Sequence, residues 1–600
     1  MIVRKGMELT ENCKQAQIRG LVILWLLAGP VGATIAIDDG TTHTISSTTT
    51  AGDNYDTDYQ STEGGGTLEI TGSGLLRFSN QRTISNSFGA GVFQIAGILE
   101  QDAPAPSYVY APVTTSGGAV LRSRQSGLYL MGGGNYAGTP VFDANGGDIW
   151  FAGGDHVVGV ATLTGSDYLR AYSGTLSLIG GINSPFGAAT GGFAVQGGTV
   201  VGLLSGLGGG SAGTISVDHA WLGTGLLDTA NLRVTGTATV AAGSTLSITN
   251  GVIANEGALS QSDFGSIDTD PTDSPAFGVL ANKGTWDLLG NADVLNTWGS
   301  GQFKNFNTLR QGDPAGHSII AAAMQNQPGA VIEVVAGSYL RCDHGGTYGA
   351  GTEFQADGHL VLGNGTHLVT SANLTGSGFL DVAGLDGSVG LIGSVGPETG
   401  PASGGFAVSG GTVNGLGGLL GGQAGTCTIS AERGRLGWGT LNAANLRFTG
   451  SAEKVASSLF GIVDGTLTNE GTMTQHTGGH FELDPDDTTQ SHGTIVNLGS
   501  WNLEGTGSIQ NSHGEGVFEN HGILRQASPT GFSLIYAKVS NQEYAIIQAD
   551  AGSKLVLNGG GSYQTGTEFH ADGHLVLGNG THVVTSANLT GSGFLDVAGL

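Results

Sequence analysis

Apolar and polar residues alternate over many short segments of the chain, and glycine, asparagine or serine separates one segment from the next. Ser247-Ile248-Thr249 and Thr466-Leu467-Thr468 are examples in which one apolar side chain lies between two polar ones. A period of two residues places alternate side chains on opposite faces of a β-strand, so that one face can be buried. The pattern therefore predicts many short β-strands.

These segments return at a nearly constant distance along the chain. Asparagine recurs at the end of an apolar segment in two series, at positions 255, 282 and 305 and at positions 469, 497 and 520. The steps of 23–28 residues are typical of one coil of a β-solenoid that holds two or three short strands. One coil cannot bury its apolar face alone, whereas stacked coils bury a continuous column of Val, Leu, Ile and Phe. We therefore predict an all-β fold, a β-solenoid of about 23–28 residues per coil.

The corners between strands are expected to hold the glycines and asparagines. Glycine adopts a positive φ without steric cost, and asparagine tolerates it. Asparagines stacked at the same corner are also expected to form hydrogen bonds with each other and with the neighbouring backbone.

Longer tandem repeats enclose these coils. Residues 351–385 and 566–600 differ only where Gln355 and Leu368 are replaced by His570 and Val583. The segment GGFAVQGGTV from residue 191 returns as GGFAVSGGTV from residue 404. We divide the chain into a signal peptide (1–33), an N-terminal cap or first coil (34–64) and three solenoid repeats (65–276, 277–491 and 492–600). The third repeat stops before its GGFAV segment, so we expect the sequence to be a fragment of a longer product.

Composition and charge narrow the possible partners. Glycine accounts for 110 of 600 residues, which argues against long helices because each interior glycine costs about 0.5–1 kcal/mol relative to alanine. Lys and Arg number 21 and Asp and Glu 48, for a net charge of −27. Such an acidic surface repels phosphate, so we expect no binding of nucleic acid. Cys13, Cys342 and Cys427 show no regular spacing and predict neither a disulfide framework nor a metal cluster.

The first 33 residues have the pattern of a secretory signal peptide. Arg4 and Lys5 precede the apolar run 21–28, and small residues up to Ala33 suit signal-peptidase cleavage. The run is short for a membrane span, and an uncleaved membrane anchor is the alternative. We expect export to the cell surface or medium, without a transmembrane span in the mature chain.

Two aligned acidic segments are candidate Ca²⁺ sites. Residues 268–273 align with residues 482–487, and the carboxylates proposed as ligands are Asp268, Asp270, Asp273, Glu482, Asp484, Asp486 and Asp487. Alternating carboxylates in a short protruding loop suit a hard cation such as Ca²⁺, which takes about six to eight oxygen ligands. The spacing is not that of an EF-hand, and the alternative is an exposed turn without metal.

Recurring histidines are a second candidate metal site. His359 and His367 lie eight positions apart, as do His574 and His582 in the later copy. An even separation on one straight strand would place both rings on the same side. Gly363 between the first two predicts a turn, which favours solvent-facing structural histidines instead.

Catalytic motifs are not found. There is no nucleophile elbow, P-loop or zinc signature. Glycosidases place two carboxylates about 5–9.5 Å apart across a cleft, whereas adjacent pairs such as Asp38-Asp39 lie in turn-like contexts. Lys and Arg are too few to build the basic groove of a lyase. We therefore predict no catalytic residue, no enzymatic activity and no cofactor other than the possible Ca²⁺.

The repeated segments of the type Asn469-Glu470-Gly471-Thr472 are Gly-, Thr- and Asn-rich and poor in Lys and Cys. With the signal peptide, they resemble bacterial autotransporter and filamentous-haemagglutinin-type β-helix surface proteins. The resemblance covers most of the mature chain and is one of composition and period. It implies a right-handed parallel β-helix that is displayed outside the cell as an adhesin.

The expected function is that of a secreted or cell-surface, adhesin-like or structural stalk. Repeated weak contacts would engage extracellular matrix, a glycan or another cell-surface ligand. The alternative is a carbohydrate-active β-helix, a polysaccharide lyase or a glycosidase. A third possibility, an ice-binding solenoid, needs ranks of threonine, and TTHTISSTTT from Thr41 is the only such run. An enzyme predicts one groove of non-repeated polar residues, whereas a stalk predicts that the exposed residues repeat.

Overall fold

The computed structural model is built of β-strands. It describes residues 24–25, 34–37, 41–51, 54–56, 65–87, 89–183, 191–203, 213–273, 275–384, 387–397, 400–416, 427–485 and 492–598, and no helix occurs in this part of the chain. The chain forms two compact units, Met1–Leu232 and Arg233–Leu600. In both, parallel strands stack coil upon coil, which confirms the predicted β-solenoid.

In the first unit each coil contributes three strands. One coil holds β10 (Ile98–Gln101), β11 (Ser107–Val109) and β12 (Val113–Thr115). Each pairs in parallel with its counterpart in the next coil, β13 (Val120–Ser123), β14 (Leu128–Leu130) and β15 (Gly134–Tyr136). One face is a six-stranded sheet in which β10 and β13 are flanked by β4 (Thr48–Ala51), β7 (Leu75–Phe78), β16 (Val141–Ala144) and β19 (Thr162–Gly165).

The N-terminal segment is described only in part. Within the predicted signal peptide the structure describes β1 (Leu24–Trp25), which pairs antiparallel with β2 (Thr34–Ala36). The remaining residues of 1–33 lie outside the described part of the chain, so the signal peptide stays a prediction.

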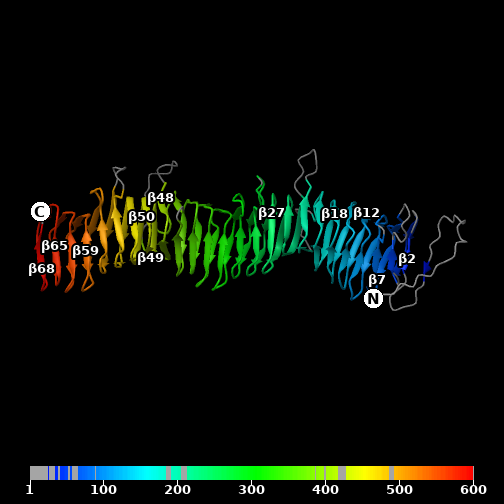
Figure 1. Cartoon of the computed structure of the whole chain (residues 1–600), viewed down its shortest axis with the longest axis horizontal. Coiled ribbons are helices and arrows are strands. Elements are labelled where there is room, and N and C mark those ends of the chain that lie inside the picture. The colour runs from blue at the N-terminus through cyan, green and yellow to red at the C-terminus, as the bar shows by residue number, and fades with distance from the viewer. Residues whose placement is uncertain are drawn as a thin grey trace. The chain divides into compact units, whose positions relative to one another are not determined.

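The second unit repeats the three-strand coil. The coil of β31 (Val279–Asn282), β32 (Thr285–Leu288) and β33 (Asp293–Leu295) is followed by that of β34 (Gln302–Asn305), β35 (Thr308–Gln311) and β36 (His317–Ile320). Figure 1 shows these coils following one another from β27 (Thr245–Thr249) to β68 (Phe594–Val597). Two strands, β50 (Gly439–Lys454) and β51 (Leu459–Asn469), are longer and pair with strands of more than one face.

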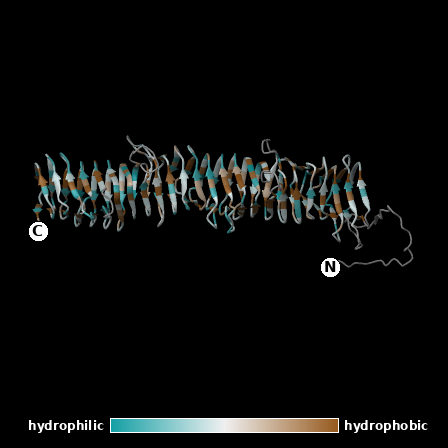
Figure 2. Ribbon diagram, turned by 90° about the horizontal axis from the view of Figure 1, so that it is seen from above, coloured by the Kyte–Doolittle hydropathy of each residue, from teal (hydrophilic) through white to brown (hydrophobic). Residues whose placement is uncertain are grey.

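The core is built by the predicted alternation of side chains. In β32, Trp286 and Leu288 are fully buried, whereas Thr285 and Asp287 lie on the outer face. Trp286 packs edge-on against Phe303 of the next coil, with ring centroids 5.1 Å apart. Brown and teal alternate along the strands in Figure 2 accordingly. Each large apolar side chain buried in this way contributes about 1.5–3 kcal/mol.

Two ladders of buried asparagines run along the second unit, as the sequence predicts. The first consists of Asn255, Asn282, Asn305 and Asn326, and the second of Asn469, Asn497, Asn520 and Asn541. In each, Nδ2 donates to Oδ1 of the next rung at 2.7–2.9 Å. The rungs are 27, 23 and 21 residues apart in the first ladder and 28, 23 and 21 in the second, so the last coil step is shorter than predicted.

The glycines beside these asparagines have a different role from the predicted one. Gly257, Gly284 and Gly471 do not have a positive φ. Instead they stack at close distance, and a Cβ atom on Gly284 would lie 1.9 Å from the carbonyl oxygen of Gly257 one coil before. Glycine is therefore required at this corner because two backbones approach each other, and not because of its torsion angle. A positive φ is used elsewhere, as at the turn residue Gly329 (φ 76°).

Candidate functional site

Two of the three carboxylates of the first acidic segment lie in the wall of the solenoid and not in the protruding loop that we predicted for all of them. Asp268 ends β30 (Ser266–Asp268) with 7% of its surface exposed, and Asp270 is 1% exposed, whereas Asp273 is exposed. The Asp268 carboxylate accepts hydrogen bonds from the Asp270 amide (3.1 Å) and the Thr297 hydroxyl (2.6 Å). Oδ2 of Asp270 accepts one from the amide of Ser300 (2.9 Å). The carboxylates thus fix this segment to the following coil.

The second acidic segment behaves similarly. Glu482 of β53 (His480–Leu483) and Asp484 are buried, because apolar neighbours such as Leu483 draw the segment into the wall of the solenoid. Oε1 of Glu482 accepts a hydrogen bond of 2.7 Å from the Ser512 amide. Asp486 and Asp487 lie outside the described residues.

The first of these segments fits Ca²⁺ poorly in the observed conformation. Of the four carboxylate oxygens of Asp268 and Asp270, only Oδ1 of Asp270 has no hydrogen-bond partner in the structure. Ca²⁺ takes about six to eight oxygen ligands. Within the described ranges, no group of three or more His, Cys, Asp or Glu residues is arranged to hold a metal ion. The Ca²⁺ sites remain a prediction from the sequence.

The recurring histidines do not share a face. His359 begins β42 (His359–Leu362) and is exposed, whereas His367 in β43 (Thr366–Val369) is fully buried, so our prediction of two solvent-facing rings is wrong for His367. The predicted turn between them is present. Nδ1 of His367 lies 3.1 Å from the Tyr348 hydroxyl, and burial lowers the pKa of His367 to about 4. The ring is therefore neutral at neutral pH and belongs to the core.

A hydrogen-bonded pair of tyrosine and histidine occurs in every repeat, with a buried histidine in the first two repeats and a partly exposed one in the third. Tyr136 and His156 form it in the first unit (3.1 Å), and Tyr563 and His582 form it near the C-terminus (3.0 Å). Sequence reasoning did not find these pairs, although the recurrence of Tyr about 20 residues before His was a usable signal.

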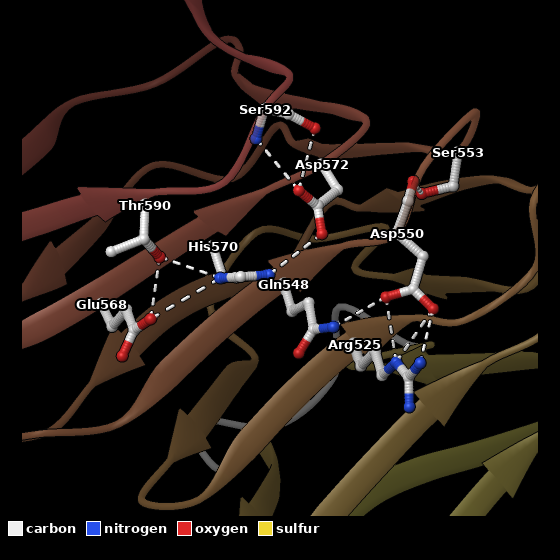
Figure 3. A network of polar contacts seen from close by, with 9 residues as sticks. All are labelled: Arg525, Gln548, Asp550, Ser553, Glu568, His570, Asp572, Thr590 and Ser592. Atoms are coloured by element: carbon white, nitrogen blue, oxygen red, sulfur yellow. Dashed lines mark hydrogen bonds and ion pairs between the residues drawn. The ribbon is translucent and has the colours of Figure 1, made fainter.

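Charged side chains on the outer face also bond mainly from coil to coil (Figure 3). Nε and Nη2 of Arg525 in β58 (Ile523–Gln526) donate three hydrogen bonds to the carboxylate of Asp550, which follows β61 (Ile546–Ala549). His570 lies beside Asp572, with its Nε2 3.1 Å from the carboxylate. Ser592 donates to Asp572 from one coil further along. The carboxylates of Asp550 and Asp572 thus link neighbouring coils.

One surface pocket of about 260 Å³ stands apart from this pattern. It lies in the second unit, where β45 (Phe379–Val382), β47 (Gly405–Val408) and β49 (Thr428–Leu436) pair side by side. Its polar and aromatic lining consists of Asp381, Ser409, Arg435, Trp438 and Ser458. The pocket combines a carboxylate, a guanidinium, hydroxyls and an indole in a small concave space.

The lining of the pocket contains charged groups of both signs. Burial raises the pKa of the Asp381 carboxyl, while the Ser409 hydroxyl, 2.9 Å from both carboxylate oxygens, and nearby Arg435 act in the opposite direction. Arg435 itself forms an ion pair of 3.0 Å with Glu453. One carboxylate and one guanidinium thus face the same space.

A buried lysine supports the pocket from below. Lys454 has no exposed surface, and its Nζ donates to the carbonyl of Gly437 (3.0 Å) and to the Ser458 hydroxyl. Both acceptors belong to residues that line the pocket. Burial lowers the pKa of Lys454 to about 7, and its ammonium lies 5.9 Å from the ring of Phe481.

Several polar residues of this pocket differ from the residues at the aligned positions of the first repeat. In the first repeat the aligned positions carry Arg170, Gln196, Trp221 and Thr224, and the position of Lys454 is Val240. There Arg170 forms a 2.6 Å ion pair with Asp148 and lies 4.9 Å from the ring of Trp150. The sequence signal that we missed was the replacement of Arg170 by Asp381 and of Trp221 by Arg435, in the strands that pair with the repeated GGFAV segments.

Comparisons with known proteins add no relative. No protein-family model matches the chain, and no curated protein matches it. No helix in the described residues is long and apolar enough to cross a membrane. The class that the fold defines is therefore that of a repetitive parallel β-solenoid.

Proposed function

We propose that this chain is a secreted or cell-surface β-solenoid that acts as an adhesin-like or structural stalk without enzymatic activity. The observation that carries the proposal is the duplication of the polar interior. The asparagine ladder that starts at Asn255 returns at Asn469, and the bond from the Trp286 indole to Gln261 returns between Trp501 and Gln475. Repetition of this kind preserves length and regularity and does not build a single reactive centre.

Export is tested by expressing the full chain with an epitope tag in a bacterial host. We expect the mature protein to begin at Thr34 and the tag to be accessible to protease added outside the cells. Beads coated with the protein are expected to bind extracellular matrix or cells. Retention in the cytoplasm with an intact N-terminus would contradict the proposal.

A carbohydrate-active enzyme is the second candidate, and the pocket at Asp381 is the observation that favours it. Ser409, Arg435 and Trp438 of this pocket are replaced by other residues in the first repeat, as expected for a groove that does chemistry. Only one of its lining residues, Asp381, is a carboxylate, whereas glycosidases generally use two. This arrangement supports binding better than hydrolysis.

A further inference from the structure

We propose that the pocket of Asp381, Ser409, Arg435, Trp438 and Ser458 binds a neutral saccharide, with one sugar ring seated against Trp438. The inference rests on the proposed extracellular function and names the ligand class of one site within it. Its basis is the exposure of Trp438, the charges and hydrogen-bonding groups of the lining, and the different residues at the aligned positions of the first repeat.

Trp438 provides an apolar surface that is open to solvent. Its side chain is 59% exposed, and within the described residues no aromatic ring or cation packs against its indole. In the first repeat, by contrast, the rings of Tyr129 and Trp150 stack on each other at 5.0 Å and Arg170 covers Trp150. Exposed indoles with a polar surround are typical of sites that bind ligands with an apolar face and a polar edge, which describes a pyranose ring.

The polar groups can accept and donate hydrogen bonds at the same time. The Ser409 hydroxyl carries one proton and can satisfy only one oxygen of Asp381, so the carboxylate retains capacity to accept from a ligand hydroxyl. The Arg435 guanidinium has five N–H groups, and its ion pair with Glu453 is made through Nε. A ligand with many hydroxyl groups matches this combination because each hydroxyl both donates and accepts.

The charged groups of the lining favour a neutral ligand. The Asp381 carboxylate would repel an acidic sugar, and the Arg435 guanidinium would repel a cationic ligand such as a polyamine. Either ion would also lose hydration on entering, which is costly unless it is fully paired. A neutral saccharide avoids both costs.

The size and support of the pocket suit one or two sugar rings. Its volume of about 260 Å³ lies just below the roughly 300–1,000 Å³ usual for sites of drug-sized ligands. Lys454 holds Gly437 and Ser458 in place through hydrogen bonds, so this wall is ordered before a ligand arrives. The aligned Val240 of the first repeat has no such donor.

The test measures binding of the full chain to arrayed neutral oligosaccharides of glucose, galactose, mannose and xylose, with oligogalacturonate and spermidine as charged probes. Trp438→Ala is the test variant. Trp298→Ala is the matched control, because Trp298 is 56% exposed and does not line the pocket. We expect at least one neutral oligosaccharide to bind, with affinity about tenfold weaker or worse in Trp438→Ala and unchanged in Trp298→Ala.

Three results would overturn the inference. They are the absence of neutral-sugar binding by the wild type, equal binding by wild type and Trp438→Ala, and binding of oligogalacturonate or spermidine that depends on Trp438. Asp381→Asn is a second test variant, because it removes the charge and keeps the size of the side chain. We expect it to bind the saccharide more weakly and to remain folded, as measured by circular dichroism. Export and adhesion of the chain are measured separately, so failure here leaves the proposed stalk function standing.

Discussion

The side-chain amide of Asn282 donates a hydrogen bond of 2.8 Å to Oδ1 of Asn305 in the following coil. The same amide donates to the Thr308 carbonyl (2.7 Å), and Oδ1 of Asn282 accepts from Asn255 (2.9 Å). Each inner rung therefore satisfies its own buried polar atoms by using those of its neighbours, whereas Oδ1 of the first rungs, Asn255 and Asn469, accepts no hydrogen bond. A rung cannot be removed without leaving unpaired groups on both sides.

We predict that Asn282→Ala lowers the free energy of unfolding of the second unit by roughly 2–4 kcal/mol, because buried donors and acceptors lose their partners. Urea denaturation followed by circular dichroism measures this. Asn307→Ala is the control, since Asn307 is exposed one coil further along, and we expect a change within about 0.5 kcal/mol. Equal effects of the two substitutions would refute the structural role of the ladder.

Gly284→Ala is predicted to be strongly destabilising, by about 3 kcal/mol or more, because the new Cβ would lie 1.9 Å from a backbone carbonyl oxygen that cannot move independently. Gly312→Ala is the matched control. There the nearest atom to a new Cβ is a Leu289 methyl carbon at 3.5 Å, an ordinary contact, and φ is not positive. Thermal unfolding of the two variants tests the close-approach account, which fails if Gly284→Ala is tolerated as well as Gly312→Ala.

The buried histidines are predicted to make the protein sensitive to acid. The pKa values of His156 and His367 are about 4, below the usual 6.5, so between these limits the unfolded chain binds more protons than the folded one. The free energy of unfolding is therefore at its full value above about pH 6.5. It falls as the pH decreases towards 4, by up to about 3 kcal/mol for each histidine.

Denaturation midpoints at pH 7, 5.5 and 4.5 measure this effect. The double variant Tyr348→Phe, His367→Leu removes both members of one of the two hydrogen-bonded pairs of the second unit, so that no hydroxyl is left unpaired. We expect a smaller pH dependence for that unit. An unchanged dependence would show that other groups cause the acid sensitivity.

Ca²⁺ is predicted to have no effect on stability. The carboxylate oxygens of Asp268 are occupied by protein donors, and only one oxygen of Asp270 is free. We therefore expect the same melting temperature with added Ca²⁺ and with a chelator. About 5 mM Ca²⁺ is used, because this concentration saturates weak extracellular sites. A rise in melting temperature with Ca²⁺ that is lost in Asp270→Asn would contradict this prediction and support a Ca²⁺ site at Asp270.

The fold was predictable because the information for it is local and repeated. Alternation in segments such as Thr466-Leu467-Thr468 predicts strands, and the recurrence of Asn255, Asn282 and Asn305 predicts the coil step and the ladder. The role of Gly284 was not predictable in the same way, because glycine serves both a positive φ and a close backbone approach, and only the position of the neighbouring coil distinguishes them.

The candidate site was less predictable. The acidic segments attracted attention through their carboxylates, but whether Asp268 faces solvent or accepts hydrogen bonds from Thr297 depends on a residue 29 positions later. The pocket joins Asp381 and Trp438 from separate coils. A search for repeated motifs passes over it, because Ser409, Arg435 and Trp438 differ from the aligned residues of the first repeat.

As a stalk without enzymatic activity, this solenoid is expected not to cleave polysaccharides. Purified protein is incubated with a panel of neutral and acidic polysaccharides, and new reducing ends and unsaturated ends are measured, with Asp381→Asn alongside. We predict no release of either kind of end from any polymer. Release by the wild type that is abolished in Asp381→Asn would contradict the claim and identify the chain as a carbohydrate-active enzyme.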